Sequence, residues 1–103
     1  MDSAEQLQRI YLAGFELQTF DRFPRAIGVI KDGCIALLEA TPDGLRMIGT
    51  PGWRMGEAIG VLVEKNGRNV FQSKDDVEEA TPDRLAALGK FRAEIERMLL
   101  PQT

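Results

Sequence analysis

The sequence contains no histidine and a single cysteine, Cys34, among its 103 residues. Without histidine the chain cannot form a Ser-His-Asp or Cys-His catalytic group, a histidine-based metal site, or the usual general base of neutral pH. One cysteine excludes an intrachain disulfide, a CxxC redox centre and a cysteine-rich zinc site. We therefore expect a protein without catalytic activity, metal or cofactor, in which Cys34 is a small core residue.

Basic charge and long apolar runs are also scarce. Lysine and arginine number 13 against 16 acidic residues, which gives a net charge of −3, whereas proteins that bind nucleic acid or anionic membranes concentrate basic residues. The longest apolar runs have four or five residues, and a bilayer span needs about 20. The first residues lack the basic and apolar regions of a signal peptide. We expect a soluble, cytoplasmic protein that binds neither nucleic acid nor membrane.

Carboxylates are the remaining groups that could perform acid–base chemistry. Asp21, Glu39, Glu57 and Glu64 lie in or beside predicted strands, but no pattern brings two of them into one cleft. The acidic run at 75–79 lacks the alternating ligands and central glycine of an EF-hand loop. We interpret that run as a solvated loop before a helix N-terminus, where negative charge is favourable.

Helical patterns stand near both ends of the chain. The first covers Ser3–Ala13, where Ser3 and Gln6 fit a capping box. The second covers Pro82–Leu100, with Thr81 as a good N-cap and proline in the first turn. Its apolar stripe consists of Leu85, Leu88, Phe91, Ile95 and Met98. Because Gly89 costs about 1 kcal/mol relative to alanine within a helix, we expect the sheet to pack closely against it.

The middle of the chain predicts an antiparallel sheet. Two pairs of apolar runs flank two-residue turns suited to type I′ hairpins. Their strands and turns are Ala26–Lys31, Asp32-Gly33, Cys34–Ala40, then Ala58–Lys65, Asn66-Gly67, Arg68–Ser73. A further strand covers Phe15–Phe23 and is ended by Pro24, and another covers Leu45–Thr50 and is ended by Pro51. Residues 41–49 could instead form a short helix. The similarity of 26–43 to 58–83 is either a duplication or a coincidence between two hairpins.

Both faces of the first predicted hairpin are apolar, although a sheet with one face in water should alternate. One face carries Ile30, Ile35 and Leu37, and the other carries Ile27, Val29, Ala36 and Leu38. The long helix can cover one face. The other requires either a sheet that curls on itself as a half-barrel or a second copy of the chain, and a homodimer is the favoured expectation.

Two segments are candidate binding sites. Trp53 is the only tryptophan and stands beside Arg54 on an expected loop after Pro51; both residue types are enriched at binding hot spots. Arg22 and Arg25 flank Phe23 at a strand end, and with Arg54 they could hold a carboxylate or phosphate group. The alternatives are that Trp53 caps the core and that the arginines are solvated.

Together these patterns predict a single α+β domain over residues 1–103. Its sheet is a strongly curved antiparallel meander of about five strands, with a short N-terminal helix and a long C-terminal helix packed on one face. The expected function is a small non-catalytic binding module that self-associates through its sheet and meets a protein partner or small ligand. The alternative is a sensor of a small anionic ligand, or a carboxylate-based enzyme, with a pocket between sheet and C-terminal helix.

Overall fold

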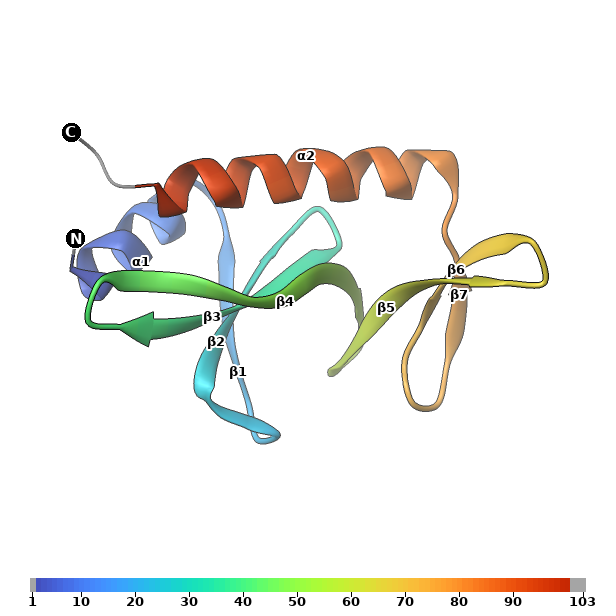
Figure 1. Cartoon of the computed structure of the whole chain (residues 1–103), viewed down its shortest axis with the longest axis horizontal. Coiled ribbons are helices and arrows are strands. Elements are labelled where there is room, and N and C mark those ends of the chain that lie inside the picture. The colour runs from blue at the N-terminus through green and yellow to red at the C-terminus, as the bar shows by residue number, and fades with distance from the viewer. Residues whose placement is uncertain (1, 101–103) are drawn as a thin grey trace.

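The computed structural model describes residues 2–100, and Figure 1 shows their arrangement. The elements are α1 (Ser3–Leu12), β1 (Glu16–Phe20), β2 (Phe23–Lys31), β3 (Cys34–Thr41), β4 (Gly44–Met55), β5 (Ala58–Lys65), β6 (Arg68–Gln72), β7 (Val77–Glu79) and α2 (Pro82–Leu99). The strands pair in chain order as an antiparallel meander. The predicted α+β class, the curved sheet and both helices are confirmed, with seven strands in place of about five.

Both predicted hairpins form in the expected register. Ile30 pairs with Ile35 across the β2–β3 turn, and Val63 pairs with Val70 across the β5–β6 turn. Asp32 and Asn66, the first residues of the two turns, have positive φ angles of 53° and 54°. Such angles belong to a type I′ turn, whose twist matches that of the flanking strands. The Asp-Gly and Asn-Gly pairs therefore determine both hairpins locally.

Two prolines lie within strands, so the prediction that they end strands is wrong. Pro24 belongs to β2, because Phe20 pairs with Phe23 around a two-residue turn that the sequence pattern did not reveal. Pro51 belongs to β4, which continues to Met55. Both prolines occupy irregular stretches: residues 24 and 25 have no partner strand, and 49–51 form a bulge opposite β3. A proline is tolerated there because no ladder hydrogen bond requires its missing N–H.

Residues 41–49 form a turn and a strand rather than the alternative short helix. The Thr41 hydroxyl donates to the Gly44 carbonyl at 2.6 Å, and Gly44 has a φ of 118°.

The acidic run at 75–79 is partly a strand, which corrects its interpretation as a loop. Val77–Glu79 pairs with β6 as an edge strand. Its three residues are too few to show a period-two pattern in the sequence. They form a strand because β6 lies beside them and pairs with them.

The predicted capping box of α1 is wrong, because Asp2 caps the helix. Its Oδ1 accepts a hydrogen bond from the Ala4 N–H at 3.1 Å. Gln6 instead turns into the protein, where only 3% of it is exposed, and its Oε1 accepts from the Leu45 N–H at 2.7 Å. β5 pairs with β4 only at residues 53–55. The beginning of β4 therefore has a strand on one side alone, and α1 supplies the acceptor on the other.

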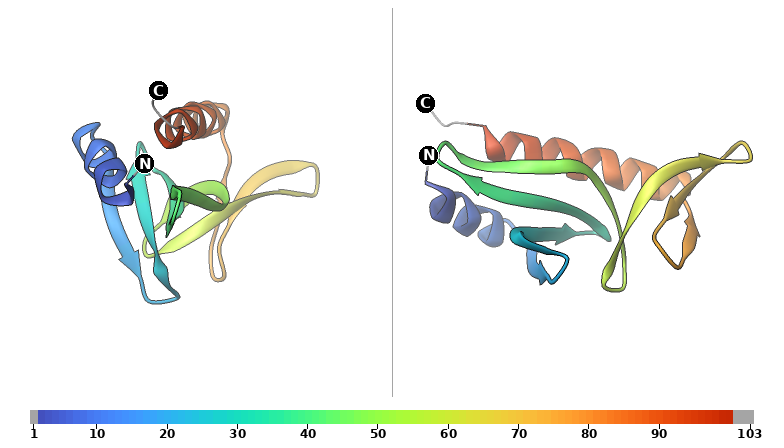
Figure 2. Two further views of the ribbon diagram at one scale, coloured as in Figure 1. Left: turned by 60° about the vertical axis from the view of Figure 1, so that its left-hand side comes forward. Right: turned by 60° about the horizontal axis from the view of Figure 1, so that its bottom comes forward.

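The long helix α2 begins after Thr81, whose hydroxyl accepts from the Arg84 N–H at 3.3 Å, as predicted. It lies over β3 and β4 and beside α1, and the core fills the space beneath it. The buried members of this core are Ile10, Phe15, Val29, Cys34, Ala36, Leu38, Leu45, Phe91 and Ile95. Figure 2 shows how strongly the sheet twists, since the β5–β6 hairpin projects away from β2 and β3.

Lys31, at the end of β2, connects three elements. Its ammonium donates to the Ala13 carbonyl after α1 at 3.1 Å and to Glu94 of α2 at 2.9 Å. It also lies 4.7 Å from the centre of the Phe15 ring. Cation–π contact and ion pairing reinforce each other in a partly buried position. Both helices are therefore fixed to the end of the same hairpin.

Gly89 does not pack closely against the sheet, which contradicts the expectation. It is exposed on α2, and a Cβ added there would have no atom within 4 Å. We expect Gly89→Ala to raise the free energy of unfolding by about 0.5–1 kcal/mol, because alanine has the higher helix propensity. Gly49→Ala is the matched control: that site is equally open, but its φ of 66° should make alanine destabilising. Urea denaturation measures both, and a neutral Gly89→Ala would contradict the prediction.

The Gln6 contact generates a second prediction. Gln6→Leu leaves the Leu45 N–H without its acceptor, so we expect a loss of about 1–3 kcal/mol in the free energy of unfolding. Gln8 is exposed on the same helix, and Gln8→Leu should change stability by less than about 0.5 kcal/mol. Equal effects of the two substitutions in thermal or urea denaturation would show that the buried hydrogen bond does not contribute.

Candidate functional site

A groove with a cavity volume of about 730 Å³ lies on the sheet face turned away from α2. Residues of β1 to β5 line it, together with the β6–β7 turn. Its apolar lining includes Phe20, Phe23, Ile35, Leu37, Ile59 and Val61. The volume is within the roughly 300–1,000 Å³ that is typical of ligand sites. This groove is the candidate functional site.

The side chains that form the floor of the groove are buried even in a single copy of the chain. Ile35 and Leu37 of β3 are 1% and 8% exposed. Phe20 packs over Gly28, where an added Cβ would lie 2.5 Å from the Phe20 ring and 3.3 Å from Ile35. Glycine at 28 therefore lets the β1 aromatic cover the central strands. Curvature of the sheet supplies much of the cover that the two-faced β2–β3 hairpin requires.

The periphery of the groove face remains exposed and apolar. Phe23 is 41% exposed beside the β1–β2 turn, and Val61 of β5 is 52% exposed. Val61 pairs with Gln72, and Gln72 pairs with Val77, so one row crosses β5, β6 and β7. Val77 is 50% exposed. Apolar groups at the border of a groove can be buried by a partner without unfolding the protein.

Four charged side chains at three turns complete the rim. Asp21 and Arg22 occupy the β1–β2 turn, Glu57 the β4–β5 turn and Lys74 the β6–β7 turn. All four residues are exposed. Within residues 2–100 none of them forms an ion pair. Figure 1 shows the three turns projecting away from α2. The rim thus presents both signs of charge without internal partners.

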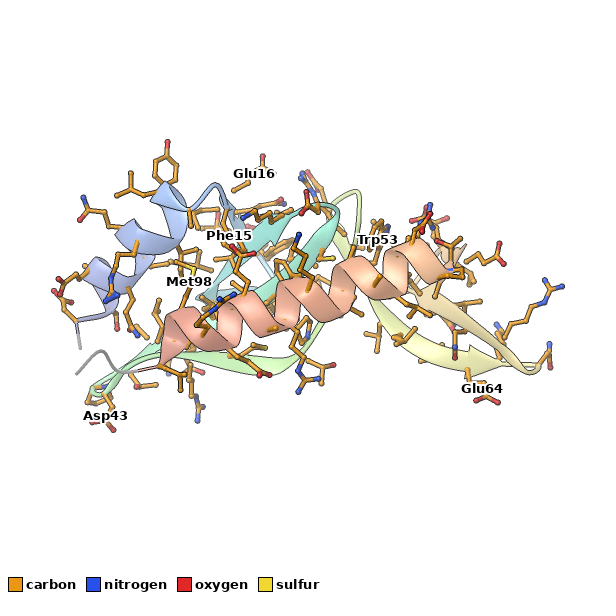
Figure 3. All side chains as sticks on the ribbon, turned by 90° about the horizontal axis from the view of Figure 1, so that it is seen from above. Phe15, Glu16, Asp43, Trp53, Glu64 and Met98 are labelled. Atoms are coloured by element: carbon orange, nitrogen blue, oxygen red, sulfur yellow. The ribbon has the colours of Figure 1, made fainter. Side chains whose placement is uncertain are left out.

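Trp53 lies in β4, so its expected position on a loop is wrong. Its ring stacks on Phe71 with centroids 5.4 Å apart, and a Cβ at Gly33 would lie 2.7 Å from it. The Arg84 guanidinium stands 5.2 Å from the ring centre. Figure 3 shows Trp53 near the N-terminal half of α2, with Met98 near its C-terminal end. The tryptophan is half-buried and caps this end of the core, and its proposed role in binding stays a prediction.

The three arginines of the predicted anion site have different environments. Arg22 lines the groove. Arg54 donates to Glu16 at 3.0 Å and to the Gly56 carbonyl at 3.3 Å, so its charge is already paired. Arg25 is exposed in β2 but does not line the groove. Of the four predicted site residues, only Arg22 therefore belongs to the groove.

Sequence patterns missed most of the groove. The turn at Asp21-Arg22 was not predicted from the sequence. It is flanked by Phe20 and Phe23, and an aromatic pair around two charged residues is the pattern that could have indicated it. No sequence pattern indicated that Lys74 lines the groove, because its position depends on the β6–β7 turn. Asp21 and Glu57, two of the carboxylates considered for catalysis, do line the same groove. Glu39, another of these carboxylates, instead forms an ion pair with Arg46 at 3.3 Å.

Neither a metal cluster nor a membrane-spanning helix is found among residues 2–100. In that range no three His, Cys, Asp or Glu side chains are grouped to hold a metal ion. No helix there is long and apolar enough to cross a bilayer.

The space between α2 and the sheet, where a ligand pocket was the alternative expectation, contains core side chains such as Phe91 and Ile95. A second cavity of about 370 Å³ lies beside Val77.

Cys34 is fully buried in the core, as predicted. Burial, and to a smaller extent the neighbouring Asp32 carboxylate, raises its pKa from 9.0 to about 11. Both causes disfavour the thiolate, which is the nucleophilic and metal-binding form. At neutral pH the thiol is protonated and inaccessible, so Cys34 stabilises the core rather than performing chemistry.

The raised pKa of Cys34 makes stability depend on pH. Below pH 9 the thiol is protonated in both the folded and unfolded states. Between pH 9 and pH 11 it ionises only when the chain unfolds, so the free energy of unfolding falls as pH rises. We expect wild type to lose about 2 kcal/mol relative to Cys34→Ala between pH 7 and about pH 10.5. A difference that is constant across this range in urea denaturation would contradict the prediction.

No family model, curated protein or solved structure matches the chain. The exposed residues of the groove are its apolar periphery and the four charged side chains of its rim.

Proposed function

We propose that the chain is a non-catalytic protein-interaction module that self-associates through the groove face of its sheet. The observation that carries this proposal is the apolar groove on the face opposite α2, bordered by exposed apolar side chains. Interfaces between proteins combine an apolar centre with a polar rim. The groove face has this composition, because Phe23 and Val61 border a dry floor and charged turns surround it.

The two signs of charge among the groove-lining residues also support self-association. A partner that is uniformly acidic or basic would be repelled by half of the rim, whereas a second copy carries both signs. The exposed apolar groups are separated by only a few strands, so one partner surface can cover them together. A homodimer is therefore the occupant that we propose.

A small ligand with an apolar body and an anionic head is the alternative occupant. Its support is the volume of the groove, about 730 Å³, together with Arg22 and Lys74 on the rim. Such a ligand would bury its body against the floor and pair its head with one of these cations. It would use the same groove but leave the chain a monomer.

Neighbouring residues of β5 provide a sharp test. Val61 lies on the groove face, whereas Leu62 pairs with Phe71 and faces the other side. Both are accessible, at 52% and 39% exposure. We expect Val61→Lys to raise the dimer dissociation constant (Kd) at least about tenfold, because it places a charge in an apolar interface. Leu62→Lys should leave the Kd within about twofold. Sedimentation equilibrium measures both constants.

Native mass spectrometry of the wild-type chain separates the two occupants. A dimer without added mass supports self-association. A monomer that carries the added mass of a small molecule contradicts self-association and favours the ligand. A dimer that is weakened equally by Val61→Lys and Leu62→Lys would also contradict the proposal, because the groove face would then have no special part in it.

A further inference from the structure

We propose that Asn66, in the β5–β6 turn, is a site of spontaneous deamidation, in which its side-chain amide is converted into a carboxylate. Asn66 and Asn69 are the two asparagines of the chain, and both belong to the β5–β6 hairpin. Neither lines the groove, so this inference is independent of the proposed self-association. Asparagine is thermolabile, and the glycine that follows Asn66 leaves the attacking nitrogen unhindered.

The reaction takes place between neighbouring groups of the same chain. The main-chain nitrogen of Gly67 gives its proton to hydroxide and attacks the side-chain carbonyl carbon of Asn66. The bond from this carbon to Nδ2 breaks, the released nitrogen takes a proton from water and leaves as ammonia, and a cyclic imide remains. Water then opens the ring, either at the side-chain carbonyl to give aspartate or at the main-chain carbonyl to give isoaspartate. Water is the only co-reactant consumed.

The turn that carries Asn66 lies at the end of a projecting hairpin. All residues from 64 to 69 are exposed, and a Cβ added to Gly67 would have no atom within 4 Å. β7 pairs only with residues 70–72 of β6, so it ends before the turn. Figure 2 shows this hairpin projecting away from β2 and β3. Opening of such an exposed tip costs little free energy.

The ladder pair that closes the turn favours this opening. Lys65 lies directly across the hairpin from Arg68, and like charges in such a position are destabilising. In the closed turn Asn66 and Gly67 have φ angles of 54° and 78°. The imide requires a different main-chain rotation from that of a type I′ turn, so opening precedes ring closure. Repulsion between the two cations therefore promotes the reaction.

The β2–β3 turn has the same type of backbone but is held closed. Its first residue, Asp32, has a φ of 53°. Trp53 covers the second, because a Cβ added to Gly33 would lie 2.7 Å from the tryptophan ring. Lys31, next to the turn, connects it to both helices. The fold thus supports one of its two type I′ turns and leaves the turn at Asn66 free to open.

The two products differ in their effect on the hairpin. Aspartate at position 66 reproduces the Asp-Gly sequence that already forms the turn at 32–33. Its carboxylate also stands next to Lys65 and Arg68, where it reduces their repulsion. Isoaspartate instead adds a carbon to the main chain, so a two-residue turn no longer matches the two strands. Isoaspartate is therefore the product that loosens the hairpin.

Peptide mass spectrometry of the folded chain, kept in mildly alkaline buffer, measures the reaction at each asparagine. Asn69 is the matched control, because it is exposed in the same hairpin but precedes Val70, and its carbonyl accepts from the Ala80 N–H at 3.0 Å. We expect Asn66 to deamidate at least about tenfold faster than Asn69, since its nitrogen nucleophile is unhindered and its turn opens readily. Equal rates at the two sites would overturn the proposal.

Comparison with the unfolded chain tests whether the exposed turn leaves the site reactive. We expect the rate at Asn66 in the folded chain to be within about tenfold of its rate in guanidinium chloride, because local opening at a hairpin tip costs little. A larger slowing in the folded chain would show that the closed turn protects the amide, and it would overturn the proposal. The Asn66→Asp variant should show no such mass change, which assigns the signal to this residue.

Discussion

The β2–β3 hairpin is apolar on both faces, and the other elements are arranged to keep water from both. Ile35 and Leu38 belong to the same strand and point in opposite directions, yet each is 1% exposed. Burial of such a side chain contributes about 1.5–3 kcal/mol. α2 packs over the face that carries Leu38, and a single helix cannot cover two faces. The face with Ile35 must therefore be covered by the sheet itself.

Local irregularities in the strands give the sheet the curvature that this cover needs. Gly28 allows the Phe20 ring to lie over the hairpin. The bulge at 49–51 bends β4, and Gly52 lies so close to Gly60 of β5 that a Cβ would collide with its carbonyl oxygen. Bulges and glycines commonly bend sheets in this way. The curvature covers the centre of the face but not its border, and the incomplete cover is the groove.

The fold uses its charges in two ways. Lys31 connects the β2–β3 hairpin to the end of α1 and to Glu94 of α2, so the two helices keep one position relative to the sheet. Other exposed charges have no ion-pair partner within residues 2–100, at the rim of the groove (Arg22 and Glu57) as well as away from it (Lys65 and Lys90). Surface charges contribute little to stability.

The sequence by itself determined the two hairpins, both helices and the two-faced core. Asp-Gly and Asn-Gly impose local φ angles, and Thr81-Pro82 begins a helix wherever the chain places it. Only the tertiary structure decided which prolines lie within strands, that Trp53 caps the core, and that Asp21 shares a groove with Lys74. Those features depend on contacts between residues far apart in the chain, and hydrophobic periodicity describes only neighbours. Most residues of the candidate site could therefore not be predicted from the sequence, because the site lies where turns from different parts of the chain meet.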